Sequence, residues 1–170
     1  MQTLSAPGLA LEPLTVAHAD AMFEVLSEQR LHEYLDYGPP ASAEHLRGVY
    51  SKLERRASPD GSEQWLNWVV CLGCTEPIGV VQATIFAPGT SWIAYVFASK
   101  HWGKGFAQAS TKVMLEHLAS RYRINTFLAT VEVENARSIA LLERLSFRRA
   151  TSQEAQAHQL TKTELLFVWP

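Results

Sequence analysis

The residues best suited to chemistry form the run Trp-Gly-Lys-Gly-Phe-Ala-Gln at positions 102–108, between an expected strand and an expected helix. Gly103 and Gly105 allow backbone dihedrals that a side chain would forbid, and they let a ligand approach the main chain closely. The first N–H groups of a helix lack intrahelical partners, and the helix dipole adds positive potential there. The run therefore predicts an anion site that fits a pyrophosphate. Lys104 either adds positive charge to this site or points into solvent.

Two common phosphate loops do not fit this run. The P-loop pattern G-x-x-x-x-G-K-[ST] fails because no Ser or Thr follows Lys104 and the glycine spacing differs. The dinucleotide pattern G-x-G-x-x-G is matched only at its first two glycines. A third pattern, [QR]-x-x-G-x-[GA], fits at Gly105, Phe106 and Ala107, with Trp102 at the position of Gln or Arg. A tight strand-to-helix turn without a ligand is the simpler alternative.

Three segments together resemble the GNAT superfamily of acyl-CoA-dependent N-acetyltransferases, in its ribosomal-protein N-acetyltransferase branch. WGKGFAQA is similar to the branch's WGKGYA loop, in which Trp is common at the first position. LHEYLDYGPPASAEHLRGVY resembles the segment that joins its first two helices. ENARSIALLERLSF resembles its N-x-x-S-x-x-L-L-E-x-L-G-F signature, with Ser146 in place of the glycine. The resemblance extends from about Leu9 to Trp169.

The periodicity of the chain predicts the elements that would position this loop. Strands are expected over residues 9–14, 65–72, 78–86, 92–98, 126–133 and 164–169, with a weak one near Phe147. Helices are expected after Thr15, after Ser42, from about Ala107 and after Asn135. The order predicts an α+β fold. The resemblance implies a GNAT-like mixed, mostly antiparallel twisted sheet of six to seven strands, with about four helices on both faces, as a single domain over residues 1–170.

The resemblance also implies where acetyl-CoA binds as co-substrate. In such proteins the strand before the loop separates from its parallel neighbour, and its exposed backbone pairs with the pantetheine arm. The loop amides hold the pyrophosphate. A conserved-motif asparagine corresponds to Asn135, whose simpler role is that of a helix N-cap. The cofactor-binding residues expected here are Val96, Phe97, Ala98, Trp102, Gly103, Lys104, Gly105, Phe106, Ala107, Gln108, Asn135 and Ser138.

The expected reaction is attack by a neutral primary amine on the thioester. It needs a group that takes the ammonium proton, donors for the oxyanion and an acid for the leaving thiolate. Many GNAT proteins supply that acid from a tyrosine, but Leu142 occupies the matching position. Ser138 is the predicted substitute, or else it only bonds a backbone carbonyl. Glu132 is the predicted base, with Glu134 as an alternative and Tyr95 as a further polar candidate. Water could also carry the proton.

The acceptor is expected between the first two helices and the hairpin strands. Tyr34, Asp36 and Tyr37 occur in the loop between those helices, and Trp65 and Trp68 occur on the hairpin. The two tryptophans are three residues apart, so they should face opposite sides of a strand. Each of these aromatic residues either lines a substrate cleft or fills the core, and the acidic Asp36 could attract a cationic amine.

The composition limits the other classes of protein to which the chain could belong. The chain has 170 residues, a formal net charge of -2 and 47% hydrophobic residues, which indicates a globular protein without a basic surface for nucleic acid. No apolar run approaches a membrane span, and no signal peptide is recognised, so a cytoplasmic location is expected. Cys71 and Cys74 form a C-x-x-C without a second cysteine pair, and two ordinary thiols and no metal are expected. Dimers through the late strands are common in the family.

Three functions follow from these observations. The first is transfer of an acetyl group from acetyl-CoA to a primary amine of a small molecule or a protein N-terminus. The second is a non-catalytic acyl-CoA-binding or regulatory module on the same fold, suggested by the absent tyrosine. The third is a different α/β enzyme whose loop holds another phosphate ligand.

Overall fold

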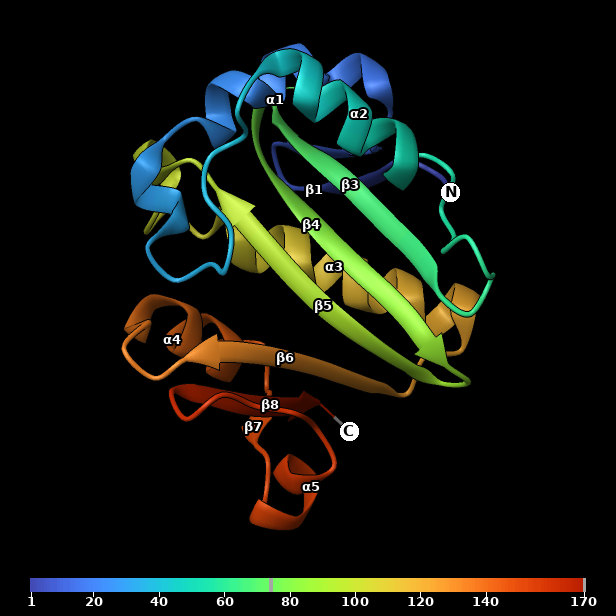
Figure 1. Cartoon of the computed structure of the whole chain (residues 1–170), viewed down its shortest axis with the longest axis vertical. Coiled ribbons are helices and arrows are strands. Elements are labelled where there is room, and N and C mark those ends of the chain that lie inside the picture. Colours follow the sequence, from blue (N-terminus) through green and yellow to red (C-terminus); the bar gives the residue numbers. More distant parts are fainter. Residues whose placement is uncertain (74, 170) are drawn as a thin grey trace.

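The structure, a computed structural model, describes residues 1–73 and 75–169. Its centre is one sheet in the order β1-β2-β3-β4-β5-β6-β8-β7 (Figure 1). Neighbouring strands are antiparallel except β5 and β6, which are parallel. The strands are β1 (Leu4–Ala6), β2 (Leu9–Pro13), β3 (Gln64–Leu72), β4 (Glu76–Ala87), β5 (Thr90–Phe97), β6 (Thr126–Glu132), β7 (Arg148–Arg149) and β8 (Glu164–Trp169).

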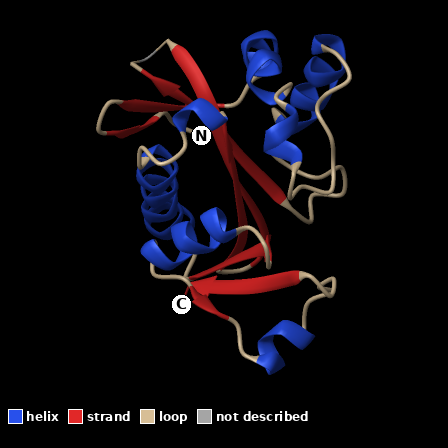
Figure 2. Cartoon of the chain, turned by 90° about the vertical axis from the view of Figure 1, so that its left-hand side faces the viewer, coloured by secondary structure: helices blue, strands red, loops and turns tan. Residues whose placement is uncertain are grey.

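Helices lie on both sides of this sheet, as the edge-on view shows (Figure 2). The α-helices are α1 (Ala19–Leu26), α2 (Ala43–Leu53), α3 (Phe106–Tyr122), α4 (Ala136–Arg144) and α5 (Ser152–Gln156). Short 3-10 turns occupy Val16–His18, Gln29–His32 and Ser99–His101. The expected mixed, mostly antiparallel α+β fold is confirmed.

Two elements were missed by the sequence analysis, so the described residues hold eight strands and five α-helices rather than six to seven and about four. β1 has three residues, too few for a periodic pattern, and a turn with Gly8 at φ +72° pairs it with β2. α5 is five residues long, too short for an apolar periodicity to predict it. Thr151 and Glu154 cap it reciprocally, so local polar bonds define it rather than apolar spacing.

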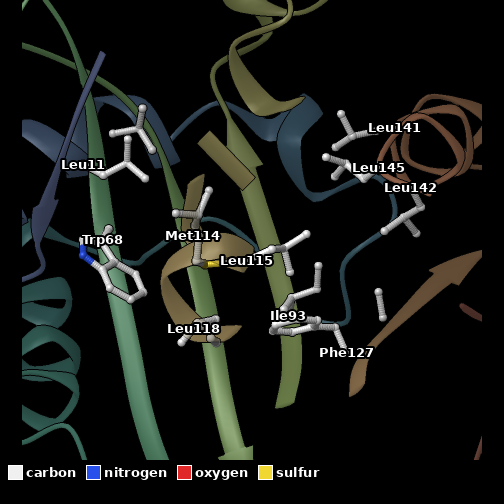
Figure 3. Close-up of a cluster of buried hydrophobic side chains, with 14 of the residues drawn as sticks. Leu11, Trp68, Ile93, Met114, Leu115, Leu118, Phe127, Leu141, Leu142 and Leu145 are labelled. Atoms are coloured by element: carbon white, nitrogen blue, oxygen red, sulfur yellow. The ribbon is translucent and has the colours of Figure 1, made fainter. Parts of the chain in front are cut away.

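The face of the sheet that packs against α3 carries the larger core. Met114, Leu115 and Leu118 of α3 meet Trp68 and Phe127 of the strands (Figure 3). Leu141, Leu142 and Leu145 of α4 extend the same cluster. Full burial of each such side chain contributes about 1.5–3 kcal/mol. This packing fixes both α3, whose first turn follows the glycine loop, and α4, which follows β6.

The opposite face is covered by α1 and α2 over only part of its length. Met22, Leu46 and Tyr50 of these helices pack on Val69 and Val96. Ser42 caps α2 as expected, because its Oγ accepts a hydrogen bond from the His45 N–H at 3.0 Å. The part of this sheet face near the start of β5 therefore lies outside the core that α1 and α2 form.

Candidate active site

The parallel pair β5 and β6 separates shortly after it begins. Register runs only from Thr90 to Trp92 on β5, opposite Thr126 to Leu128 on β6. Figure 1 shows the two strands side by side at one end and diverging toward α4 at the other. Both strands keep their other neighbours, since β5 stays paired with β4 and β6 with β8. The sheet therefore contains an internal gap with one closed end.

Main-chain groups of both flanking strands, β5 and β6, point into this gap. The Ala98 N–H donates to the Ile78 oxygen of β4 at 2.9 Å, so alternation turns the backbone groups of Tyr95 and Phe97 away from β4. On the other bank, the Val133 N–H donates to the Thr163 oxygen at 2.8 Å. The same alternation turns the backbone groups of Thr130 toward β5. These groups could pair with an extended ligand as a strand would.

The glycine loop lies at the C-terminal end of β5. Gly103 and Gly105 have φ of +74° and +79°, and a Cβ built at either would meet nothing within 4 Å. The first hydrogen bond of α3 runs from the Ala109 N–H to the Gly105 oxygen at 2.9 Å. The N–H groups of the preceding helical residues therefore have no intrahelical acceptor. The loop has the left-handed glycines and open helix start that a pyrophosphate site requires.

Trp102 forms part of the wall beside this loop. Its indole Nε1 donates to the Phe97 oxygen at 2.7 Å, which fixes the ring against the end of β5. The Arg137 guanidinium lies 3.8 Å from the ring centroid and that of Arg30 lies 5.1 Å away. Arg137 also lies 3.8 Å from a Glu33 carboxylate oxygen. The first turn of α4 is thus tied to the opposite wall of the cleft.

Tyr95 and Ser138, predicted separately, meet inside the cleft. The Tyr95 hydroxyl lies 3.0 Å from the Ser138 Oγ and donates to the Ser138 carbonyl at 3.3 Å. Burial raises the pKa of Tyr95 to about 12, although the Ser138 hydrogen bond opposes this shift. The phenol is therefore neutral near pH 7 and acts as a hydrogen-bond donor. Asn135 is an N-cap of α4, since its Oδ1 accepts from the Ser138 N–H at 3.1 Å.

The gap opens into a cleft of about 1300 Å³. Most of the predicted cofactor and catalytic residues line it, including Glu132 and the alternative Glu134. Tyr34, Asp36 and Tyr37 also line it, from the loop between the first two helices. Two predicted residues lie outside the lining, because Ala98 is buried against β4 and Lys104 is exposed on the loop. Arg30 and Arg137 were missed because neither belongs to a spaced pattern.

A smaller cavity of about 350 Å³ adjoins the cleft and shares with it walls from β4, β5 and β6. Trp65 lines this cavity, whereas Trp68 is fully buried on the other face and donates from Nε1 to the Gln2 oxygen at 3.0 Å. The expectation that the two tryptophans face opposite sides is therefore confirmed. Asn67 and Gln82 also line the cavity, and sequence reasoning did not identify them.

The remaining sequence candidates are the two cysteines and the residue types that bind metal ions. Cys71 is buried in β3, and Cys74 lies outside the described residues. Across residues 1–73 and 75–169, no group of three or more His, Cys, Asp or Glu side chains is arranged to hold a metal ion. Within the same ranges, no helix is both long and apolar enough to cross a bilayer.

Comparisons with known proteins agree with this geometry. Residues 9–148 match the family model described as Acetyltransferase (GNAT) domain. The chain is 26% identical over 151 residues to the N-acetyltransferase p20 of Bacillus licheniformis, covering 88% of this chain and 84% of that protein.

Two solved structures are similar in fold. RimL, a ribosomal L7/L12 alpha-N-protein acetyltransferase in complex with coenzyme A, has a TM-score of 0.80 at 20% identity, covering 99% of this chain and 97% of that one. Mycobacterium smegmatis RimJ in complex with a coenzyme A disulfide has a TM-score of 0.78 at 22% identity, covering 99% and 85%.

Proposed function

This chain belongs to the GNAT acetyltransferase family, and we propose that its acetyl-CoA and its amine acceptor meet in the gap between β5 and β6. The reaction is transfer of an acetyl group from acetyl-CoA to an amine. One observation supports this location of the active site: the parallel pairing of β5 with β6 stops after three residue pairs, beside a helix start that can hold phosphates. The 170 residues would form one catalytic domain.

Binding of acetyl-CoA would use main-chain groups chiefly. The amides from Gly103 to Gln108 would hold the pyrophosphate at the N-terminus of α3. The pantetheine arm would pair with Tyr95 and Phe97 on one bank. The Phe97 carbonyl already accepts from Trp102, so its N–H is the group left for the ligand. The backbone groups of Val96 face β4 and not the gap. We therefore propose that, of the strand residues expected to pair with the pantetheine arm, only the odd-numbered neighbours of Val96 do so.

The chemistry forms a C–N bond to the acetyl carbon and breaks the C–S bond, while the amine loses a proton and the thiolate gains one. The Tyr95 hydroxyl, held by Ser138, is the proposed donor to the departing sulfur. Its pKa of about 12 excludes a role as base near neutral pH. A main-chain N–H on β5 would stabilise the oxyanion. Glu132, at the end of β6, is the proposed acceptor of the amine proton, directly or through water.

The acceptor is proposed to be a primary amine of a small molecule or of a protein N-terminus. The RimL structure supports the second class, since that protein is an alpha-N-protein acetyltransferase. We also propose a cytoplasmic protein without nucleic-acid or membrane partners, because the net charge is only -2. A homodimer through the late strands belongs to the same proposal.

Thermal unfolding with acetyl-CoA tests the binding step. A ligand at one hundred times its dissociation constant stabilises the folded state by about 2.7 kcal/mol, or about 5–10 °C for a chain of this size. No shift at millimolar acetyl-CoA would contradict the proposal. Stronger stabilisation by ATP or NAD would point to a different phosphate ligand.

Release of the coenzyme A thiol across a panel of primary amines tests the chemical step. Acceptor-dependent release is expected. A thermal shift without any release would instead identify a non-catalytic acyl-CoA-binding module.

A further inference from the structure

The chain between α1 and α2 forms one wall of the cleft. Residues 33–37 all line it, and Figure 1 shows this segment beside the end of β5 and near α4. Among the described residues, positions 36–41 make no hydrogen bond between main-chain groups. This part of the wall therefore depends on side-chain contacts for its position.

His32 connects the wall to the end of α1. It is only 7% exposed, and its Nδ1 lies 3.0 Å from the Tyr37 carbonyl oxygen while its Nε2 lies 2.9 Å from the Leu26 carbonyl oxygen. Leu26 is the last residue of α1, so its carbonyl has no intrahelical donor. The rings of His32 and Tyr37 also meet edge-on, with 5.6 Å between their centroids. One buried side chain thus joins the helix to the far end of the wall.

Both ring nitrogens of His32 face oxygens that can only accept hydrogen bonds. A neutral imidazole has one N–H and one lone pair, whereas an imidazolium has two N–H groups. Only the imidazolium can donate in both contacts. The negative end of the α1 dipole lies at Leu26, where a cation is favoured.

His18 gives the contrast within the same protein. Its Nδ1 lies 3.1 Å from the Thr15 N–H, and its Nε2 lies 3.1 Å from a Glu12 carboxylate oxygen. A neutral ring satisfies both contacts, because Nδ1 accepts and the Nε2 proton is donated. The surroundings of the two rings therefore call for different numbers of ring protons.

The acidic residues nearest to His32 along the chain are engaged elsewhere. The Glu28 carboxylate accepts from the Ser99 N–H at 3.0 Å, and a Glu33 carboxylate oxygen lies 3.8 Å from the Arg137 guanidinium. Among residues 1–73 and 75–169, no carboxylate forms an ion pair with His32. The two carbonyl oxygens are therefore the groups that receive its ring protons.

The other titratable groups on this side carry no negative charge near neutral pH. The Arg30 guanidinium lies 5.1 Å from the centroid of the Trp102 ring. Burial, and next the charge of Asp36, raises the pKa of Tyr37. Burial, and next the neighbouring Tyr37, raises the pKa of Tyr50 on α2. Both phenols are thus neutral, and neither replaces a carbonyl oxygen as the partner of the imidazolium.

From these observations we infer that His32 is a positioning residue for the amine acceptor: as an imidazolium, it holds the wall at residues 33–37 to the end of α1. The inference rests on the proposed function, because it assumes that the acceptor binds against this wall. His32 does not line the cleft, so it acts through Tyr34, Asp36 and Tyr37, which do. Loss of its contact with Tyr37 should weaken acceptor binding and leave the cofactor loop in place.

The ¹⁵N NMR spectrum of the histidine rings in the unmodified protein tests the protonation state. Histidine ordinarily changes its charge between about pH 5 and 8. At about pH 7 both ring nitrogens of His32 should carry protons, whereas His18 should have one protonated and one bare nitrogen. Loss of the corresponding signals in the variants below assigns the two rings. A His32 ring with a single protonated nitrogen would overturn the inference.

Two substitutions separate the two contacts of His32. The side-chain amide nitrogen of glutamine can take the place of Nε2, and that of asparagine can take the place of Nδ1. His32→Gln should therefore lose the contact with Tyr37 and raise the KM of the amine about 10-fold, as expected for one hydrogen bond, in an assay of thiol release. The KM of acetyl-CoA and the acetyl-CoA thermal shift should not change. His32→Asn keeps the contact with Tyr37 and should raise the KM of the amine less.

His18→Gln is the matched control, because it makes the same substitution at the start of α1, outside both cavities. It should lower the melting temperature and leave both KM values unchanged. An unchanged amine KM in His32→Gln would contradict the inference, and so would an equal rise in His18→Gln or in the KM of acetyl-CoA. Failure of the proposed function is distinct, since the unmodified protein would then release no thiol with any amine, whatever its NMR spectrum.

Discussion

The two sides of the gap are built in different ways. On the proposed cofactor side, the glycine loop and the end of β5 come from one continuous stretch, and the groups available to a ligand are mostly main-chain N–H groups. On the side of the smaller cavity, the walls come from three strands and are formed largely by side chains, among them Trp65, Asn67, Gln82 and Thr130. A backbone site depends on a few glycines and a helix start. A side-chain site can change at each position without disturbing the fold.

Gly105→Val should have the largest effect, which is loss of acetyl-CoA binding. Valine at φ +79° adds about 1–2 kcal/mol of strain and moves the first turn of α3, so the acetyl-CoA thermal shift and thiol release should be lost. Gly61→Val is the matched control, because Gly61 has φ +74° and equally open surroundings in an exposed turn. It should lower stability by a similar amount and keep the thermal shift. Loss of the shift in both variants would contradict the loop's role.

Tyr95→Phe should affect the chemical step where the two sides meet. We expect kcat to fall about 10- to 100-fold, with little change in the acetyl-CoA thermal shift, because only the hydroxyl donor is removed. Ser138→Ala should give a smaller loss. The double variant should lose less than the sum of the two, since the hydroxyls form one pair. Tyr122→Phe, at the end of α3 and outside the cleft, is the control and should leave kcat unchanged.

The pH profile gives a second test of Tyr95. Because burial raises its pKa to about 12, the phenol stays protonated in the folded protein well above pH 10. No decline in kcat from loss of this proton is expected below about pH 10. Its contribution to folding stability is complete below pH 10, the ordinary pKa of tyrosine, and is lost as the pH rises toward 12. Urea unfolding of the protein and of Tyr95→Phe across this range measures that contribution.

Arg137→Ala should weaken acetyl-CoA binding moderately. The guanidinium stacks on Trp102 beside the phosphate loop, and a cation–π contact contributes about 0.5–2 kcal/mol. The dissociation constant of acetyl-CoA should rise about 3- to 30-fold, measured by titration calorimetry. Arg137→Lys keeps the charge but not the planar stack, so it separates the two contributions. Unchanged affinity in both variants would show that the stack is structural only.

Ser146→Gly should have the smallest effect, and it should alter neither cofactor binding nor the smaller cavity. Ser146 has φ +67° at the end of α4, where the Phe147 N–H donates to the Leu142 oxygen and the Ser146 N–H to the Glu143 oxygen. This is a Schellman cap, which favours glycine. The substitution should raise stability by about 0.5–1 kcal/mol and leave KM and kcat unchanged. A lowered melting temperature would contradict this account.

The same contrast explains how much of the site the sequence could predict. Gly103, Gly105 and Asn135 belong to a local pattern, so the loop, the start of α3 and the cap of α4 were predicted at their positions. The order of the elements followed from periodicity and the arrangement of the sheet from the family resemblance, except for β1 and α5, which are short. Asn67 and Arg137 are ordinary residues of a strand and a helix. Their neighbours, in the smaller cavity and at the Trp102 ring, are brought close only by the fold, so no local signal identified them.

The early end of the ladder between β5 and β6 also bears on aggregation. A sheet edge attracts any extended chain that can pair with it, and proteins protect such edges. Here the outer strands β1 and β7 have only three and two residues. The unpaired groups of Tyr95 and Thr130 form an additional edge inside the sheet, with strands on both banks. Strands flank this internal edge on both sides and the ladder closes one end of it, so it is less open to a strand of another copy than an outer edge would be, while its backbone still faces the ligand.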